Sequence, residues 1–304
     1  MDRNLKKSLP SESVCIFGEV LFDDFPDGKR VLGGAPFNVA WHLQALGQSP
    51  RFISRVGNDS LGRAIREAME AWGLSTSSLQ TDSNNPTGTV RVLIEAGEPS
   101  YEIVPERAYD FISPKHISDE APCSLLYHGT LALRNQQSAS TLAQLKRNHR
   151  GKIFMDVNLR APWWNNAQVM ELLSDAHWVK LNEHELRALH PDRTDPINTA
   201  ARWFQETHEL QLLVVTRGAG GAIALGEEQE LIEVVPAGGF EVVDTVGAGD
   251  AFAAVLLLGL TLKWSLPATM DRAQVLASAL VGQRGATVND ENFYRTFIEA
   301  WKLS

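Results

Sequence analysis

Cysteine is nearly absent from this sequence of 304 residues, which contains only Cys15 and Cys123. Both lie in apolar, strand-like stretches, and this favours buried free thiols in a reducing cytoplasm over a disulfide or a metal site. The eight histidines show no spacing typical of metal ligands. Long apolar runs are absent too, because the run at residues 251–262 is shorter than the ~20 residues of a membrane span. We therefore expect a cytoplasmic protein with no membrane segment and no disulfide.

Basic residues are also scarce, since 28 lysines and arginines face 37 aspartates and glutamates and leave a net charge of −9. No block of lysine or arginine overrides this balance, which argues against a nucleic-acid partner. It leaves a phosphate-bearing substrate open, because helix N-termini and Mg²⁺ can hold phosphate on an acidic protein. Residues 1–13 are polar and lack the apolar segment of a secretory signal, so we expect a loose N-terminal tail. Residues 14–304 show no repeat or linker, which predicts one domain.

Strand-like apolar runs alternate with helical ones, which predicts an α/β fold with a doubly wound, mostly parallel sheet flanked by helices. The predicted strands cover residues 14–17, 51–56, 125–128, 152–157, 178–181 and 212–216. The predicted helices cover residues 39–46, 61–72, 138–148, 167–173, 183–189, 199–207, 251–262, 268–284 and 291–301. Two segments, about residues 20–32 and 87–110, break the alternation with an Asp-Gly turn and a hairpin pattern. They could form an antiparallel edge of the main sheet.

The most informative stretch of the chain is Asp244-Thr245-Val246-Gly247-Ala248-Gly249-Asp250. Residues 240–243 before it are extended and apolar, and the run at 251–262 is apolar on every side, which predicts a buried helix. A strand would thus turn through two glycines into a helix whose free N–H groups and positive dipole end suit an anion. Asp250 adds a carboxylate there, as transfer of phosphate to a hydroxyl requires. The structural alternative makes Asp250 a helix cap and the glycines a tight turn.

This stretch resembles, at every specified position, the second signature of the ribokinase-like (PfkB) carbohydrate kinases, Asp-Thr-x-Gly-Ala-Gly-Asp. Residues 33–38, Gly-Gly-Ala-Pro-Phe-Asn, resemble the first signature of the same family and precede a predicted helix. Gly33 and Gly34 would let the backbone approach a sugar closely, and Asn38 offers a donor and an acceptor to its hydroxyls. The alternative for Asn38 is a structural role near the helix start. Two signatures in the family's order are much harder to match by accident than one.

The resemblance implies two further substrate-binding residues. Asp23, which follows the first predicted strand, would bridge two sugar hydroxyls; its neighbour Asp24 competes for this role, and a solvated loop acid is the alternative. Residues 156–160, Asp-Val-Asn-Leu-Arg, are similar to a string in fructokinases and ketodeoxygluconate kinases. Arg160 would hold oxygens of the substrate or of phosphate through its planar fork. The alternative for Arg160 is a structural ion pair with a neighbouring acid.

The nucleotide would lie beyond the later strands. Asn182 begins an Asn-x-x-Glu motif that the family uses around the phosphates and Mg²⁺. Thr216, Gly218 and Gly221 resemble the family's Thr-x-Gly-x-x-Gly turn against ATP, although a hairpin turn into residues 222–225 explains these glycines as well. The N–H groups of Gly247 and Gly249 would complete the ATP site.

Two metal ions follow from the resemblance. Glu185, the last residue of the Asn-x-x-Glu motif, would hold Mg²⁺ through water, since Mg²⁺ keeps several waters and needs few direct carboxylates. The same two residues also read as a capping box at a helix start, and both interpretations can hold together. The family often needs K⁺, bound by loop carbonyls, and Asp244 and Val246 are candidate contributors.

The resemblance covers residues 18–286 and implies an ATP-dependent sugar kinase. Asp250 would accept the hydroxyl proton, and the N–H groups of Gly247, Ala248 and Gly249 would stabilise the transferring charge. The motifs are most similar to those of bacterial fructokinases, which predicts conversion of fructose to fructose 6-phosphate. Ketodeoxygluconate or another ketose comes next, then a nucleoside; a non-catalytic sugar- or nucleotide-binding regulator is the alternative of a different class. The resemblance also implies that segments 20–32 and 87–110 form a β-lid over the sugar and a homodimer contact.

Overall fold

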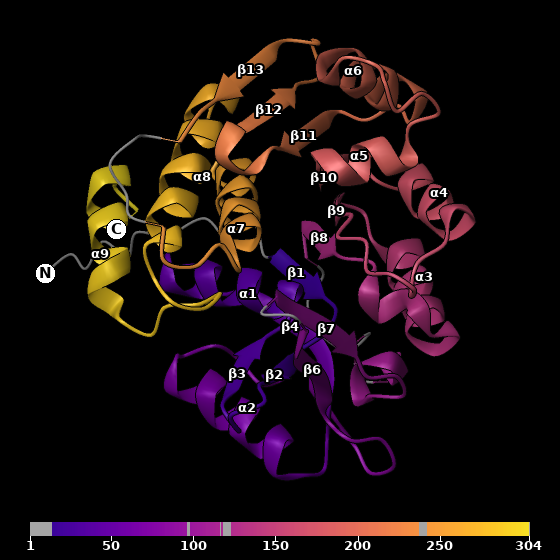
Figure 1. Cartoon of the computed structure of the whole chain (residues 1–304), viewed down its shortest axis with the longest axis vertical. Coiled ribbons are helices and arrows are strands. Elements are labelled where there is room, and N and C mark those ends of the chain that lie inside the picture. The colour runs from indigo at the N-terminus through magenta and orange to yellow at the C-terminus, as the bar shows by residue number, and fades with distance from the viewer. Residues whose placement is uncertain (1–13, 96–97, 116, 118–122, 237–241, 304) are drawn as a thin grey trace, which may run out of the picture.

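A nine-stranded sheet runs through the centre of the protein (Figure 1). The computed structural model describes residues 14–95, 98–115, 117, 123–236 and 242–303. In spatial order the strands are β13 (Leu231–Val234), β12 (Ala222–Leu225), β11 (Leu212–Thr216), β10 (Trp178–Asn182), β9 (Lys152–Asp156), β8 (Leu125–His128), β1 (Val14–Phe17), β4 (Arg51–Gly57) and β5 (Leu79–Asp82). Neighbours are parallel from β11 to β5, and β12 is antiparallel to both β11 and β13. The prediction of a mostly parallel sheet is confirmed.

All six strands predicted from continuous apolar runs are present, and their ends agree within one residue. The strands β5 and β13 were not predicted, because each is short and half exposed and so has no continuous apolar run. The strand predicted at 240–243 is wrong where it can be assessed: residues 240 and 241 lie outside the described residues, and Val242 and Val243 are exposed and not in a strand. The N–H groups of Val243 and Asp244 donate instead to the carbonyl of Val281.

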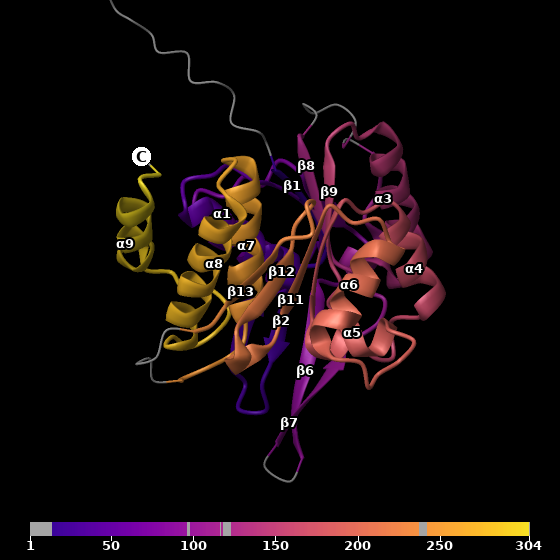
Figure 2. The same cartoon turned by 90° about the horizontal axis from the view of Figure 1, so that it is seen from above.

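Helices cover both faces of the sheet (Figure 2). One face carries α1 (Ala35–Ala45), α2 (Ser60–Ala71), α7 (Ala248–Thr261), α8 (Leu266–Val281) and α9 (Glu291–Trp301). The other carries α3 (Gln136–Asn148), α4 (Asn166–Ser174), α5 (Glu183–Leu189) and α6 (Ile197–Thr207). All nine predicted helices are present. Helix α7 is buried on every side, as its composition predicts, because it packs against both α1 and α8.

The two segments that break the alternation form a separate four-stranded sheet, in the order β3-β2-β6-β7. Its strands are β2 (Leu21–Asp24), β3 (Arg30–Gly33), β6 (Gly88–Glu95) and β7 (Glu98–Ile103). The arrangement as an antiparallel edge of the main sheet is therefore wrong. Strand β2 begins shortly after the end of β1, and β3 leads directly into α1. The small sheet is thus attached at the carboxyl end of β1.

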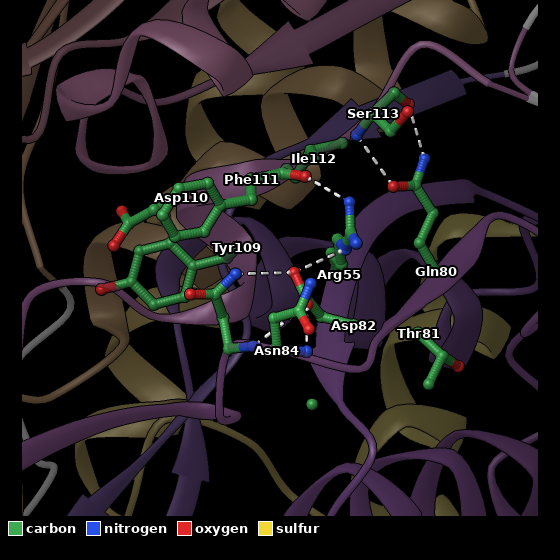
Figure 3. A network of polar contacts seen from close by, with 12 residues as sticks. Arg55, Gln80, Thr81, Asp82, Asn84, Tyr109, Asp110, Phe111, Ile112 and Ser113 are labelled. Atoms are coloured by element: carbon green, nitrogen blue, oxygen red, sulfur yellow. Dashed lines mark hydrogen bonds and ion pairs between the residues drawn. The ribbon is translucent and has the colours of Figure 1, made fainter.

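After β7 the chain returns to the main sheet and is fixed there by side-chain contacts (Figure 3). Arg55 donates to the carbonyl of Phe111 at 2.7 Å and forms an ion pair with Asp82 at 2.9 Å. Gln80 exchanges two hydrogen bonds with the backbone of Ser113, at 2.7 and 2.8 Å. Because Arg55 and Gln80 belong to β4 and β5, the exit of the small sheet is anchored to the outer strands of the main one.

The two cysteines form a disulfide, with their Cα atoms 5.8 Å apart, so the prediction of free thiols is wrong. Cys15 lies in β1 and Cys123 just before β8, and these two strands are parallel neighbours. Their proximity results from a strand register that the sequence does not reveal. Free thiols were the reason to expect a reducing compartment, and the disulfide removes that reason. Among the described residues, no helix is long and apolar enough to cross a membrane, and no group of three histidine, cysteine or acidic residues could hold a metal ion.

Candidate active site

The parallel strands of the main sheet end at one edge, where ligands bind in open α/β sheets. Several predicted site residues stand at this edge. Asp156 is the last residue of β9, Asn182 of β10 and Thr216 of β11. Asn182 and Thr216 are direct register partners, so the two predicted nucleotide-binding residues lie side by side.

The two signature stretches meet at Asp250. Its carboxylate accepts a hydrogen bond from the Asn38 side-chain amide at 2.8 Å, across 212 residues of sequence. Among the described contacts that carboxylate caps no N–H group of its helix; the N-cap of α7 is Gly247. The capping interpretation of Asp250 is therefore wrong. Gly247 has a left-handed φ of +80°, and a Cβ there would collide with Ala286, so only glycine fits.

The charge state of Asp250 is set by its surroundings. Burial raises the pKa of Asp250 to about 6, while the hydrogen bond from Asn38 lowers it. Asp156 raises this pKa further, and Lys180 and Arg160 lower it. The carboxylate is consequently ionised at neutral pH, yet basic enough to accept a proton, which is the condition that an efficient general base meets.

The backbone beside Asp250 offers donors to an anion. In the part of the chain that the structure describes, the N–H groups of Gly247 and Gly249 have no hydrogen-bond partner, and that of Ala248 is directed at the carbonyl of Thr245 over 3.4 Å. These three groups belong to the first turn of α7 and its cap, at the positive end of the helix dipole.

A buried ion pair lies beneath this turn. Lys180 is 3.6 Å from the point where a Cβ on Gly249 would stand, and its ammonium is 2.9 Å from both carboxylate oxygens of Asp156. The hydroxyl of Tyr127 also donates to Asp156, at 3.1 Å. Burial opposes the charged form, but Asp156 prevails and raises the pKa of Lys180. Lys180 was not among the predicted site residues, although it is the only charged residue of a strand that is otherwise apolar or uncharged.

The structure distinguishes Asp23 from Asp24. Asp24 forms an ion pair with Arg30 at 2.7 Å, whereas Asp23 has no ion pair among the described residues. The Asp23 carboxylate is 3.5 Å from the position of a Cβ on Gly33, so the two predicted sugar-binding residues lie together. Burial raises the pKa of Asp23 to about 6, with a further contribution from Asp24 and an opposing one from Arg160.

Arg160 is exposed and forms no ion pair within the described part of the chain, so the structural ion pair is absent. Its charge lowers the pKa values of Glu19, Asp23 and Asp250. The guanidinium of Arg160 is therefore close enough to act on all three carboxyl groups. A Cβ on Gly34 would stand 2.8 Å from the carbonyl of Glu19, so the close approach of these two backbone segments also requires a glycine there. The predicted sugar-binding role of Gly34 stays a prediction.

Glu19 is a second residue that sequence reasoning did not single out. It is 2% exposed, and among the described residues its Oε2 atom has no hydrogen-bond partner. Burial raises the pKa of Glu19 to about 7. The available signal was an acid two residues after the end of an apolar strand, at the ligand edge of the sheet.

Asn182 and Glu185 form the predicted capping box. Asn182 Oδ1 accepts from the Glu185 N–H at 2.9 Å, and Glu185 Oε2 accepts from the Asn182 N–H at 2.8 Å. Glu185 Oε1 also accepts from the N–H of Leu159 at 2.8 Å. Both carboxylate oxygens therefore accept one backbone hydrogen bond, and each keeps a second lone pair.

The glycine-rich turn after β11 is a hairpin into β12, as the structural interpretation predicted. Gly221 has a φ of +79°, and a Cβ there would collide with the carbonyl of Val234 in β13. Gly218 has a φ of +55° and no heavy atom within 4 Å of its Cβ position. Packing against β13 therefore explains why residue 221 is a glycine. Residue 218 faces open space, so no neighbouring atom excludes a side chain there.

Asp244 joins two loops beside the first turn of α7. Its Oδ1 accepts from the Val246 N–H and its Oδ2 from the Gly285 N–H, both at 3.0 Å. Gly285 adjoins Ala286, which packs against Gly247. Both loops are thereby held next to Gly247.

Known proteins resemble this chain over most of its length. Residues 12–292 match the model of the pfkB family carbohydrate kinases. A fructokinase from Klebsiella pneumoniae is 34% identical over 262 residues, which are 81% of this chain and 84% of that protein. The structure of a fructokinase from Vibrio cholerae O395 with fructose, ADP and a calcium ion has a TM-score of 0.80 at 28% identity, covering 94% of this chain and 98% of that one. A double mutant of that fructokinase, with fructose, ADP and a potassium ion, has a TM-score of 0.81 at 28% identity, covering 95% and 99%.

Proposed function

The chain belongs to the pfkB family of carbohydrate kinases, and from this premise we propose that it transfers the γ-phosphoryl group of ATP to fructose, giving fructose 6-phosphate. Membership makes the chain a phosphotransferase that acts on a sugar hydroxyl. The choice of fructose is supported by the fructokinases among its relatives. The observation that carries the mechanism is the contact of Asn38 with Asp250, because it joins a hydroxyl-binding amide to a candidate base beside an anion site.

In the proposed reaction the sugar hydroxyl lies against Asp250, which takes its proton as the oxygen attacks the γ-phosphorus. The bond from that phosphorus to the bridging oxygen of ADP breaks in line. Donors at Gly247, Ala248 and Gly249 stabilise the charge of the transferring group, which is the main contribution a protein makes to such a step. Asp23 and Asn38 orient the sugar, and Arg160 holds oxygens of the sugar or of the phosphate through its planar fork.

Nucleotide and metal use are common to the related fructokinase structures, which hold ADP with calcium or potassium. Mg²⁺ is our proposal for this chain, and it would neutralise charge on the phosphates. Glu185 would take part through water, with the lone pairs that its two backbone hydrogen bonds leave free. For K⁺ we propose the loops that Asp244 joins, with Val246 as a contributor. Asn182, Thr216 and Gly218 would line the rest of the nucleotide site.

A second acceptor is favoured by one observation. Arg160 is exposed and forms no ion pair with another described residue, so its guanidinium is available to a substrate carboxylate. Ketodeoxygluconate carries such a carboxylate and fructose does not. The same arginine would hold phosphate or hydroxyl oxygens if the acceptor is fructose, and a substrate panel separates the two.

We test the proposal with release of ADP from MgATP, using fructose, ketodeoxygluconate, ribose, tagatose and adenosine as acceptors, with and without K⁺. Turnover is expected with fructose, and it should fall roughly 10²–10⁴-fold in Asp250→Asn, the range that a general base contributes. Undiminished turnover in that variant would refute the role of Asp250. Binding of sugar and nucleotide without turnover of any acceptor would support the non-catalytic regulator instead.

We also propose that the small sheet covers the sugar as a lid and forms a homodimer contact. Leu93 and Tyr101, on β6 and β7, have 42% and 56% of their surface exposed, which would suit such a contact. Light scattering of the full chain tests the dimer, since replacement of both residues by serine would then yield a monomer. We also propose that the protein is located in the cytoplasm, because the proposed reaction uses ATP.

A further inference from the structure

A cavity of about 550 Å³ lies far from Asp250, where β9 and β10 begin. It lies between the end of α3, the turn into β9, the end of α4 and the turn into β10. Both strands run from this cavity to the candidate active site, where they end at Asp156 and Asn182. A strand of five residues spans roughly 16 Å, at about 3.3 Å per residue. The cavity is therefore separate from the site described above.

Positive charge gathers at this cavity, although the chain as a whole carries a net charge of −9. Its cationic or titratable basic residues are Lys146, Arg147, His149, Arg150 and His177, and its only acid among the lining residues is Asp175. Such a local reversal of sign attracts an anion to this part of an otherwise acidic surface.

Lys146 gives the cavity a buried cation. Its side chain is 6% exposed, and among the described residues its ammonium has no hydrogen-bond partner. The nearest acid is Asp175, 3.8 Å away and itself 59% exposed. Burial lowers the pKa of Lys146 to about 8, although Asp175 and Glu171 oppose the shift. A buried ammonium without hydrogen bonds is costly, so an anionic oxygen in the cavity would supply what it lacks.

The two histidines are held in place by backbone. The N–H of Ile153 donates to His177 Nδ1 at 3.2 Å, so the neutral ring carries its proton on Nε2. The Nε2–H of His149 donates to the carbonyl of Lys152 at 3.0 Å. His177 is consequently a hydrogen-bond donor even when uncharged, which suits an oxyanion.

We propose that this cavity binds the phosphoryl group of an organic phosphate, with Lys146 as the buried cation and Arg150 and His177 as further donors. Pockets for small organic ligands have volumes of about 300–1,000 Å³, and this cavity falls in that range. Inorganic phosphate alone would leave most of it unfilled. A sugar phosphate combines the required dianion with a body of suitable size.

The test uses the full chain with its active site saturated by fructose and a non-hydrolysable MgATP analogue, in buffer free of phosphate and sulfate. Fructose 1,6-bisphosphate and inorganic phosphate are titrated separately by calorimetry. We expect the bisphosphate to bind at one additional site and inorganic phosphate to bind at least tenfold more weakly. Equal affinity for the two would overturn the assignment to an organic phosphate, and no binding of either would overturn the site.

Variants assign the binding to this cavity. Lys146→Met keeps the apolar stem and removes the charge, and should weaken the bisphosphate at least tenfold. Arg150→Gln changes an exposed residue and should weaken it severalfold, so the test survives if Lys146→Met fails to fold. Arg295→Gln removes the same charge from an exposed position on α9 and should leave affinity unchanged. Wild-type affinity in both cavity variants, or equal loss in Arg295→Gln, would refute the proposal.

Discussion

Replacement of Asn38 by leucine is expected to move the acid limb of the pH–rate profile to higher pH. The wild-type limb should lie near pH 6, where the buried carboxyl of Asp250 titrates. Activity requires the ionised carboxylate, so it is lost as pH falls through this pKa. The Asn38 amide donates to that carboxylate at 2.8 Å and favours its charged form. Without the amide, protonation begins at a higher pH, and the loss of activity begins there too.

The size of the shift follows from the strength of the hydrogen bond. A hydrogen bond to a charged group contributes about 1.5–3 kcal/mol. Since one pKa unit corresponds to about 1.4 kcal/mol, the limb should move by roughly one to two units. Leucine has the same branching and number of side-chain heavy atoms as asparagine and cannot donate, so Asn38→Leu removes the bond while keeping the shape of the side chain. The KM for the sugar should rise as well, because Asn38 is also a proposed sugar ligand.

The assay is kcat at saturating substrates, followed between about pH 5 and about pH 9 by direct measurement of the sugar phosphate. Direct detection avoids the titration of coupling enzymes. Two other carboxyls with raised pKa values, those of Glu19 and Asp23, require controls. Glu19→Gln and Asp23→Asn should each retain the limb near pH 6. The reasoning is refuted if Asn38→Leu keeps the wild-type limb, or if the limb disappears in either control.

Three further outcomes are expected. Asp23→Asn should raise the KM for the sugar at least tenfold in steady-state assays, whereas Asp24→Asn should not, since it breaks an exposed pair worth about 0–1 kcal/mol. Gly247→Ala should lower both the melting temperature and kcat, because its left-handed φ and the adjacent loop leave no room for a Cβ. Lys180→Met should lower the free energy of unfolding, measured in urea, by about 3–5 kcal/mol, because it leaves the charge of Asp156 buried without a partner. Adding Asp156→Leu should recover most of that loss. If the losses of the two substitutions add instead, the buried ion pair is contradicted.

The strands that could be predicted from the sequence are those formed by continuous apolar runs. β1 is a continuous buried apolar run, and its predicted bounds agree with the structure at both ends. β5 is half exposed and was not found, since its stability depends on pairing with β4. Val242 and Val243 are apolar yet exposed, so hydrophobicity predicted a strand that is absent there. Local pattern cannot indicate whether a segment finds a partner strand.

The candidate site divides in the same way. Short motifs identified Asp250 and Asn38 separately, but the hydrogen bond between them depends on how the chain folds over a sequence separation of 212 residues. Glu19 and Lys180 were missed because both are buried in the folded protein. The sequence shows that they are charged but does not show that they are buried. The disulfide of Cys15 with Cys123 was missed for a related reason, as it follows from the register of β1 and β8.

The proposed sugar ligands Asp23 and Gly33 belong to the small sheet, while Asp250 lies in the first turn of α7, which packs on the large sheet. The small sheet's share of acceptor recognition and the activation of the hydroxyl are thus built on different pieces of backbone, while Asn38 on α1 and Arg160 after β9 add proposed sugar contacts from the main body of the protein. An exchange of residues 21–33 and 88–103 for those of a relative with another acceptor would alter which sugar is held while the transfer apparatus stays intact. Evolution can likewise vary the two independently, and this architecture makes the protein a favourable starting point for engineering kinases of unusual sugars.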